Sequence, residues 1–178
     1  DNSLFRRGMP TLNVSWSPGA TILTGDFLFA RAAQLAAETN NVRIVNTFAQ
    51  TLMIIVDGEL NQLFNDGHDN VPSEEEYKER IYAKTASLFA AGTETGAVLC
   101  NAPEEEVNAL RDYGYHLGMG FQIIDDILDF KGDEEQIGKP VANDLRQGIA
   151  TLPVMLFNQQ NPNRSEERRV GKECRSRW

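Results

Sequence analysis

The chain has 178 residues, 41% of them hydrophobic, and a formal net charge of −9. This length fits one domain with a substantial core. No apolar run approaches the ~20 residues that a membrane-spanning helix needs, and nothing resembles a secretory signal. The acidic balance argues against a nucleic-acid-binding groove. We therefore expect a soluble, cytoplasmic protein, and the start at Asp1 without a methionine suggests a fragment.

Residues 164–178 differ abruptly from the rest of the chain. They contain six Lys or Arg and three acidic residues, and they lack a helical apolar period. RSEER at their start matches the translation of a common sequencing-library adapter, so we predict an artefact outside the fold rather than a genuine basic tail. Removing their net charge of +3 changes −9 to −12. Cys100 then remains alone, which is compatible with a reducing cytosol.

Helical periodicity dominates the rest of the sequence, and strand alternation is nearly absent. After an irregular opening, the pattern predicts a first helix over about 20–39 and a second over about 42–64. Ser73 and Glu76 form an S-x-x-E capping box that predicts the start of a third helix, which reaches about Cys100.

A fourth helix is predicted from just after Pro103, where three glutamates favour a helix start, to about Phe130. A loop over 131–148 and a last helix from about Ile149 follow. The predicted fold class is all-α, a bundle of long helices.

The fourth predicted helix ends in FQIIDDILDF, residues 121–130, which sets three aspartates among large apolar side chains. On a helix, Gln122, Asp125, Asp126 and Asp129 share a stripe, so the carboxylates are expected to converge. Converging carboxylates need a cation between them, and their oxygens suit Mg²⁺ held together with substrate phosphates. A solvent-facing amphipathic helix is the plain alternative for such a short pattern.

Cationic residues elsewhere could complement this stripe. The pair Arg6 and Arg7 can clamp phosphate oxygens in bidentate fashion. Lys84 lies in AKTA, a run of small residues that we expect to leave space around its ammonium group. Lys139 lies in the predicted loop that follows the aspartates. Each residue alone is most simply a surface charge, and the combination with the aspartates favours a diphosphate site.

These strings occur in a characteristic order: DNSLFRRGMPT, TILTGDFLFARA, DGELNQL, AKTASLF, FQIIDDILDF and GKPVANDLRQGIATLPV. In this order they resemble the trans-isoprenyl diphosphate synthases, or polyprenyl synthetases, of the medium- or long-chain type more than the farnesyl type. The resemblance covers residues 1–158 and implies a bundle of long helices around a deep pocket. It also implies Mg²⁺-dependent condensation of an allylic diphosphate with isopentenyl diphosphate, usually by a homodimer.

The resemblance also implies roles for individual residues. Asp125 and Asp126 would face the metal ions and Asp129 would support them. Arg6 would contact the allylic diphosphate, Arg7 would contact isopentenyl diphosphate, and Lys139 would help to close the site. Lys84, Thr85 and Gln122 would line the allylic diphosphate site and act in catalysis.

The chain departs from the family pattern at its start, where a second aspartate motif is expected. Only Asp1 stands at the spacing of that motif's last residue, so we assign Asp1 to the metal set and expect the leading aspartates to be missing. We therefore expect residues 1–163 to be a partial synthase domain, truncated at both ends and inactive by itself.

Three alternatives to chain elongation remain. A class I terpene cyclase also ionises an allylic diphosphate with aspartates and Mg²⁺. A noncatalytic subunit of a heteromeric synthase would be expected to lose the aspartates and basic residues that this chain retains. An acidic helical scaffold would show no metal-dependent diphosphate binding.

Overall fold

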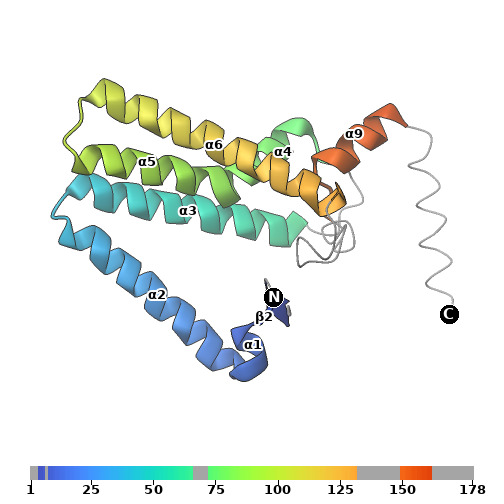
Figure 1. The fold of residues 1–178 in the computed structure, drawn as a ribbon, viewed down its shortest axis with the longest axis horizontal. Coiled ribbons are helices and arrows are strands. Elements are labelled where there is room, and N and C mark those ends of the chain that lie inside the picture. Colours follow the sequence, from blue (N-terminus) through green and yellow to red (C-terminus); the bar gives the residue numbers. More distant parts are fainter. Residues whose placement is uncertain (1–3, 7, 66–71, 132–148, 162–178) are drawn as a thin grey trace.

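The computed structural model describes residues 4–6, 8–65, 72–131 and 149–161 (Figure 1). Within these ranges the chain is almost entirely helical, which confirms the predicted all-α class. In chain order the elements are β1 (Phe5–Arg6), β2 (Met9–Pro10), α1 (Leu12–Ser15), α2 (Pro18–Glu38), α3 (Val42–Asn65), α4 (Glu74–Ile81), the π-helical turn η1 (Tyr82–Ala86), α5 (Ser87–Leu99), α6 (Glu104–Lys131) and α9 (Leu152–Gln160).

The long helices begin and end within a few residues of their predicted limits. The predicted capping box is present: Glu76 N donates to Ser73 Oγ at 3.1 Å, and Ser73 N donates to Glu76 Oε2 at 2.6 Å. The opening, predicted to be irregular, instead contains a short antiparallel hairpin that pairs Phe5 with Pro10. Gly8 in its turn has a φ of 73°, a left-handed conformation that glycine adopts without strain. The predicted loop over 131–148 lies almost wholly outside the described residues.

The predicted third helix is not continuous. Between Tyr82 and Ala86 it widens into the π-helical turn η1, which separates α4 from α5. Such a turn accommodates one extra residue, so side chains on either side of it point in directions that a regular helix would not give. Hydrophobic periodicity did not reveal this change, because the run stays helical throughout.

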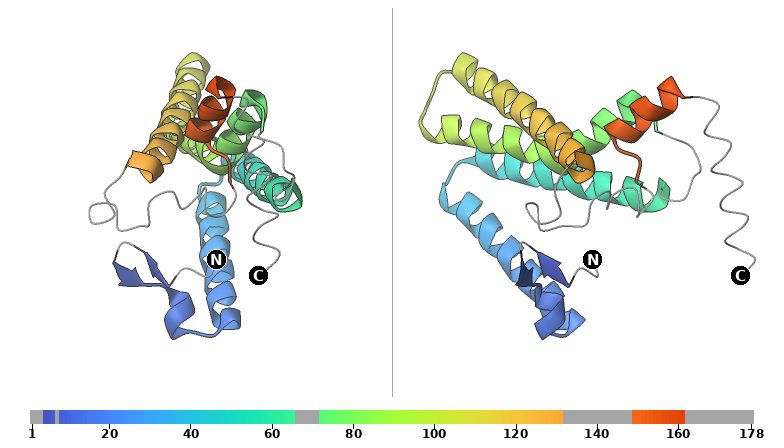
Figure 2. Two further views of the ribbon diagram at one scale, coloured as in Figure 1. Left: turned by 90° about the vertical axis from the view of Figure 1, so that its right-hand side faces the viewer. Right: turned by 45° about the vertical axis from the view of Figure 1, so that its right-hand side comes forward.

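Helices α3, α5 and α6 lie side by side along much of their length, and α4 and α9 cover one end of this layer (Figures 1 and 2). The largest buried side chains cluster there: Tyr77 and Ile81 from α4 pack with Met155 from α9. Helix α2 diverges from α3 after the turn that joins them, and it has no buried residue. Among the described residues, no helix combines the length and hydrophobicity needed to cross a bilayer.

At the opposite end of the layer, one arginine connects three helices. Arg43, at the start of α3, donates to Glu94 of α5 at 3.0 Å and to Glu104 of α6 at 2.6 Å. These bonds hold the pKa of the Arg43 guanidinium above its ordinary value, and the pKa of Glu104 is lowered by the same contact. Three helices are therefore joined in register far from α4 and α9.

Glycines let η1 approach both of its neighbours closely. A Cβ added at Gly118 of α6 would lie 2.5 Å from Ala86 Cα, and one added at Gly58 of α3 would lie 2.5 Å from Ala83 Cβ. Ala83 and Ala86 are buried. The small residues around Lys84, expected to leave space for its ammonium group, therefore include two alanines that pack against neighbouring helices.

We predict that Gly118→Ala destabilises the fold, because the added methyl group would overlap the η1 backbone and push α6 away. Overpacking of this kind costs about 1–3 kcal/mol, and thermal unfolding would measure it. Gly120→Ala is the matched control on the same helix, since nothing lies within 4 Å of a Cβ added there. It should leave stability unchanged or raise it by up to ~1 kcal/mol. Equal effects of the two substitutions would contradict the close packing.

Candidate functional site

A chain of hydrogen bonds connects α4, η1 and α6 at the end of the bundle that α9 covers. Thr85 Oγ1 donates to Gln122 Oε1 at 2.8 Å, and Gln122 Nε2 donates to Asp126 Oδ1 at 2.9 Å. The Tyr77 hydroxyl donates to the other carboxylate oxygen, Asp126 Oδ2, at 2.8 Å. The structure thus brings together three predicted site residues, Thr85, Gln122 and Asp126, with Tyr77, which was not predicted.

The backbone arrangement explains why these side chains meet. Gln122 and Asp126 are four residues apart on α6, so they lie above one another on the same face. Gly118, one turn earlier on that face, touches Ala86, the neighbour of Thr85. The close approach of η1 to α6 therefore sets the distance over which Thr85 can reach Gln122.

Asp126 is buried, with only 3% of its surface exposed. Burial raises the pKa of its carboxyl group, and the hydrogen bonds from Gln122 and Tyr77 act in the opposite direction. Burial, together with the bond to Asp126, raises the pKa of the Tyr77 hydroxyl. Tyr77 therefore remains a donor, and its bond favours the ionised form of the carboxylate that accepts it.

The other two aspartates of the motif differ from Asp126. Asp125 is exposed and Asp129 is half-buried, and their spacing of four residues places both on one side of α6. The described residues contain no group of three or more His, Cys, Asp or Glu side chains placed to hold a metal ion. The expected convergence of three carboxylates is thus not seen among the described residues, because Asp126 is turned toward Tyr77.

The carboxylate oxygens on α6 are still suitable ligands for a magnesium ion. Mg²⁺ is usually held in proteins by one or two carboxylates, with substrate phosphates and water completing its shell. Asp125 and Asp129 offer hard oxygen ligands of that number on one helix face. The assignment of Asp125, Asp126, Asp129 and Asp1 as the metal set stays a prediction, and Asp1 lies outside the described residues.

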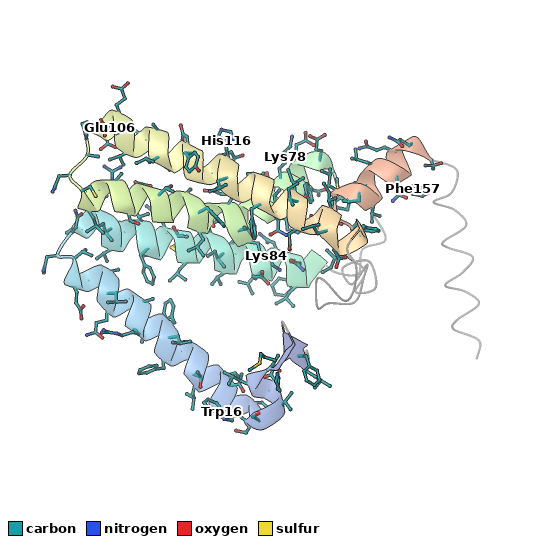
Figure 3. The ribbon with its side chains drawn as sticks, in the orientation of Figure 1. Trp16, Lys78, Lys84, Glu106, His116 and Phe157 are labelled. Carbon is teal, nitrogen blue, oxygen red and sulfur yellow. The ribbon has the colours of Figure 1, made fainter. Side chains whose placement is uncertain are left out.

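Lys84 lies on the side of η1 that faces α3, away from Lys78 on α4 (Figure 3). Its ammonium group is 3.3 Å from Glu59 Oε1 of α3, and both side chains are about half exposed. An ion pair this exposed contributes little to stability. Lys84 can therefore exchange Glu59 for an anionic ligand at small cost.

Other predicted substrate-binding residues are not described. Arg7 and Lys139 lie outside the described residues, and for Arg6 only the backbone is described, paired with Met9 in the hairpin. Two residues that the sequence analysis missed are Tyr77 and Glu59. A signal for Tyr77 existed, since an aspartate embedded among apolar residues needs a donor, but no local spacing connects α4 to α6.

Comparison with known proteins gives consistent results. A profile of the family described as polyprenyl synthetase matches residues 1–175. Heptaprenyl diphosphate synthase component 2 from Geobacillus stearothermophilus is 44% identical over 155 residues, covering 87% of this chain and 48% of that protein. Octaprenyl diphosphate synthase from Escherichia coli (strain K12) is 39% identical over 155 residues, with the same two coverages. These names agree with the predicted medium- or long-chain resemblance.

Solved structures agree with the fold. Heptaprenyl diphosphate synthase from Staphylococcus aureus matches with a TM-score of 0.87 and 36% identity, over 92% of this chain and 51% of that one. A polyprenyl synthase from Caulobacter crescentus CB15, complexed with calcium and isoprenyl diphosphate, matches with a TM-score of 0.85 and 41% identity. That match covers 96% of this chain and 52% of the other.

The chain spans about half the length of the curated relatives that it matches. The profile match nevertheless extends over nearly all of its residues, and the relatives exceed 30% identity over most of the chain. The helical fold matches solved members as well. On these grounds, this chain belongs to the polyprenyl synthetase family.

Proposed function

We propose that the protein containing this chain is a Mg²⁺-dependent prenyltransferase. It would condense an allylic diphosphate with isopentenyl diphosphate and so elongate a trans-polyprenyl diphosphate. The observation that carries the proposal is the bonded series Thr85–Gln122–Asp126, which joins AKTASLF and FQIIDDILDF. The same two elements carry exposed charges of opposite sign: Lys84 lies on η1 and Asp125 lies on α6. The names of the relatives support the same reaction class.

Each residue has a defined task in this proposal. Asp125 and Asp129 would hold Mg²⁺, which supplies charge neutralisation to the diphosphate as its C–O bond breaks. Lys84 would leave Glu59 and bind a diphosphate oxygen. Thr85 and Gln122, already held by hydrogen bonds, would orient the leaving group without further ordering. The double bond of isopentenyl diphosphate then attacks the allylic cation, and loss of a proton completes one five-carbon addition.

Assembly is a further part of the proposal. The family resemblance favours a homodimer. Two relatives, from Geobacillus stearothermophilus and Bacillus subtilis, are named component 2 of a heptaprenyl diphosphate synthase, which favours one component of a multicomponent enzyme as the second candidate. The mass of the native complex and the identity of its chains would distinguish the two. A terpene cyclase would instead form product without isopentenyl diphosphate.

We predict that Lys84→Ala weakens Mg²⁺-dependent binding of a nonhydrolysable allylic diphosphate by about 10- to 100-fold, because a charge-assisted hydrogen bond to the ligand is lost. Calorimetry with and without Mg²⁺ would measure this. Lys78→Ala is the matched control, since Lys78 is similarly exposed and pairs with Glu74 on the other side of the bundle. Metal-independent binding, or equal losses in both variants, would contradict the proposed site.

We also predict that Asp126→Asn removes a pH-dependent cost of folding, in addition to the pH-independent effect of replacing one acceptor oxygen by an amide nitrogen. The raised pKa of Asp126 means that its ionised form is disfavoured on folding. This cost begins as pH rises through the ordinary carboxyl pKa of 3.8 and is complete above the raised folded value. We therefore expect the Tm of Asp126→Asn, relative to that of the unaltered chain, to be higher at pH 7.5 than at pH values below 3.8.

The same comparison at acidic pH tests the direction in which the stability difference changes with pH. The pH-dependent advantage of Asp126→Asn over the unaltered chain should shrink as pH falls through the raised folded pKa and vanish below 3.8, where the carboxyl group becomes protonated in both states. Asp125→Asn is the control, because Asp125 is exposed. It should change Tm little while weakening diphosphate binding in the presence of Mg²⁺. A Tm difference between Asp126→Asn and the unaltered chain that stays the same at both pH values would contradict this account of the buried carboxylate.

A further inference from the structure

Tyr77 makes the one described contact that connects α4 to the aspartate motif through a side-chain hydrogen bond. Only 1% of its surface is exposed, and its hydroxyl ends 2.8 Å from Asp126 Oδ2. The ring packs with Ile81 and Met155 in the core. The phenol is therefore an apolar core residue with a polar end directed at one carboxylate.

A second residue, Arg80 of the same helix, contacts the Tyr77 ring. The guanidinium carbon of Arg80 lies 5.6 Å from the centre of the Tyr77 ring, within the range of a cation–π contact. Arg80 also donates to the backbone carbonyl of Ala150 at 2.7 Å, just before α9. Tyr77 is thus fixed between α6 and the start of α9.

Both carboxylate oxygens of Asp126 accept bonds from protein donors, one from Tyr77 and one from Gln122. The Gln122 amide is in turn fixed at both ends, because its oxygen accepts from Thr85. Loss of the tyrosine hydroxyl would release the Asp126 carboxylate to rotate and remove the fixed acceptor of the Gln122 amide. The orientation of Gln122 therefore depends on a residue that does not touch it.

We propose that Tyr77 is a positioning residue of the diphosphate site: through Asp126 it fixes Gln122 and Thr85 in the arrangement that meets the ligand. This rests on the proposed function, since it assigns a role within that site. Partners that orient site residues in this way typically change metal affinity or activity 10- to 100-fold when removed. Tyr77 itself lies inside the core and acts only through Asp126.

Tyr77→Phe tests the proposal in the whole 178-residue chain, because it removes one oxygen and keeps the packed ring. Tyr113→Phe is the matched control, the same change on α6 at a side chain that is 59% exposed. The first measurement is the NMR signal of the Gln122 side-chain amide, assigned by its loss in Gln122→Glu. We expect that signal to move in Tyr77→Phe and to stay in place in Tyr113→Phe.

The second measurement is calorimetric binding of inorganic pyrophosphate in the presence of Mg²⁺. We expect Tyr77→Phe to bind at least ~10-fold more weakly than the unaltered chain, and Tyr113→Phe to bind equally well. An unmoved amide signal would overturn the proposal. So would a moved signal with unchanged affinity, because Tyr77 would then organise only the core. Failure of the unaltered chain to bind would contradict the diphosphate site proposed on these residues, while the amide signal would still show whether Tyr77 fixes Gln122.

Discussion

The site depends on how closely η1 is packed between α3 and α6. Gly118 meets Ala86 on one side and Gly58 meets Ala83 on the other, so at these points η1 contributes only alanine methyl groups between the backbones. Each contact lies beside a polar pair: Gly118 is one turn from Gln122, which bonds Thr85, and Gly58 precedes Glu59, which pairs with Lys84. Short side chains at these points let polar groups on three elements reach one another.

A buried carboxylate is the second feature that a stable bundle alone does not require. Asp126 loses hydration on folding, and the hydrogen bonds from Tyr77 and Gln122 compensate only in part, because the pKa of the carboxyl group remains raised. A buried ionisable group is typical of a functional site, where a residue needed for function can lower the stability of the fold.

The sequence predicted the helices well because their signals are local. Periodicity located α2, α3 and α6, and Ser73 with Glu76 located the start of α4. The π-helical turn was missed because a helix with one extra residue keeps nearly the same apolar pattern. The set of site residues stays a prediction, and the structure shows which of the described members meet. Thr85, Gln122 and Asp126 do meet, whereas their partner Tyr77 lies 49 positions from Asp126, beyond the reach of any local spacing.

The aspartates show why orientation needs the fold. Consecutive residues on a helix are about 100° apart, so Asp125 and Asp126 cannot both project fully to one side. The structure assigns one to each side: Asp126 accepts bonds inside the bundle and Asp125 faces outward. Lys84 and Thr85 divide in the same way, with Thr85 bonded to α6 and Lys84 exposed beside α3. In each pair one residue, Asp126 or Thr85, forms a hydrogen bond to a neighbouring helical element. This hydrogen bond limits the backbone movement of the adjacent exposed residue, Asp125 or Lys84. A charged side chain on such a backbone loses only side-chain entropy when it binds an ion of opposite charge, because the backbone that carries it is already ordered.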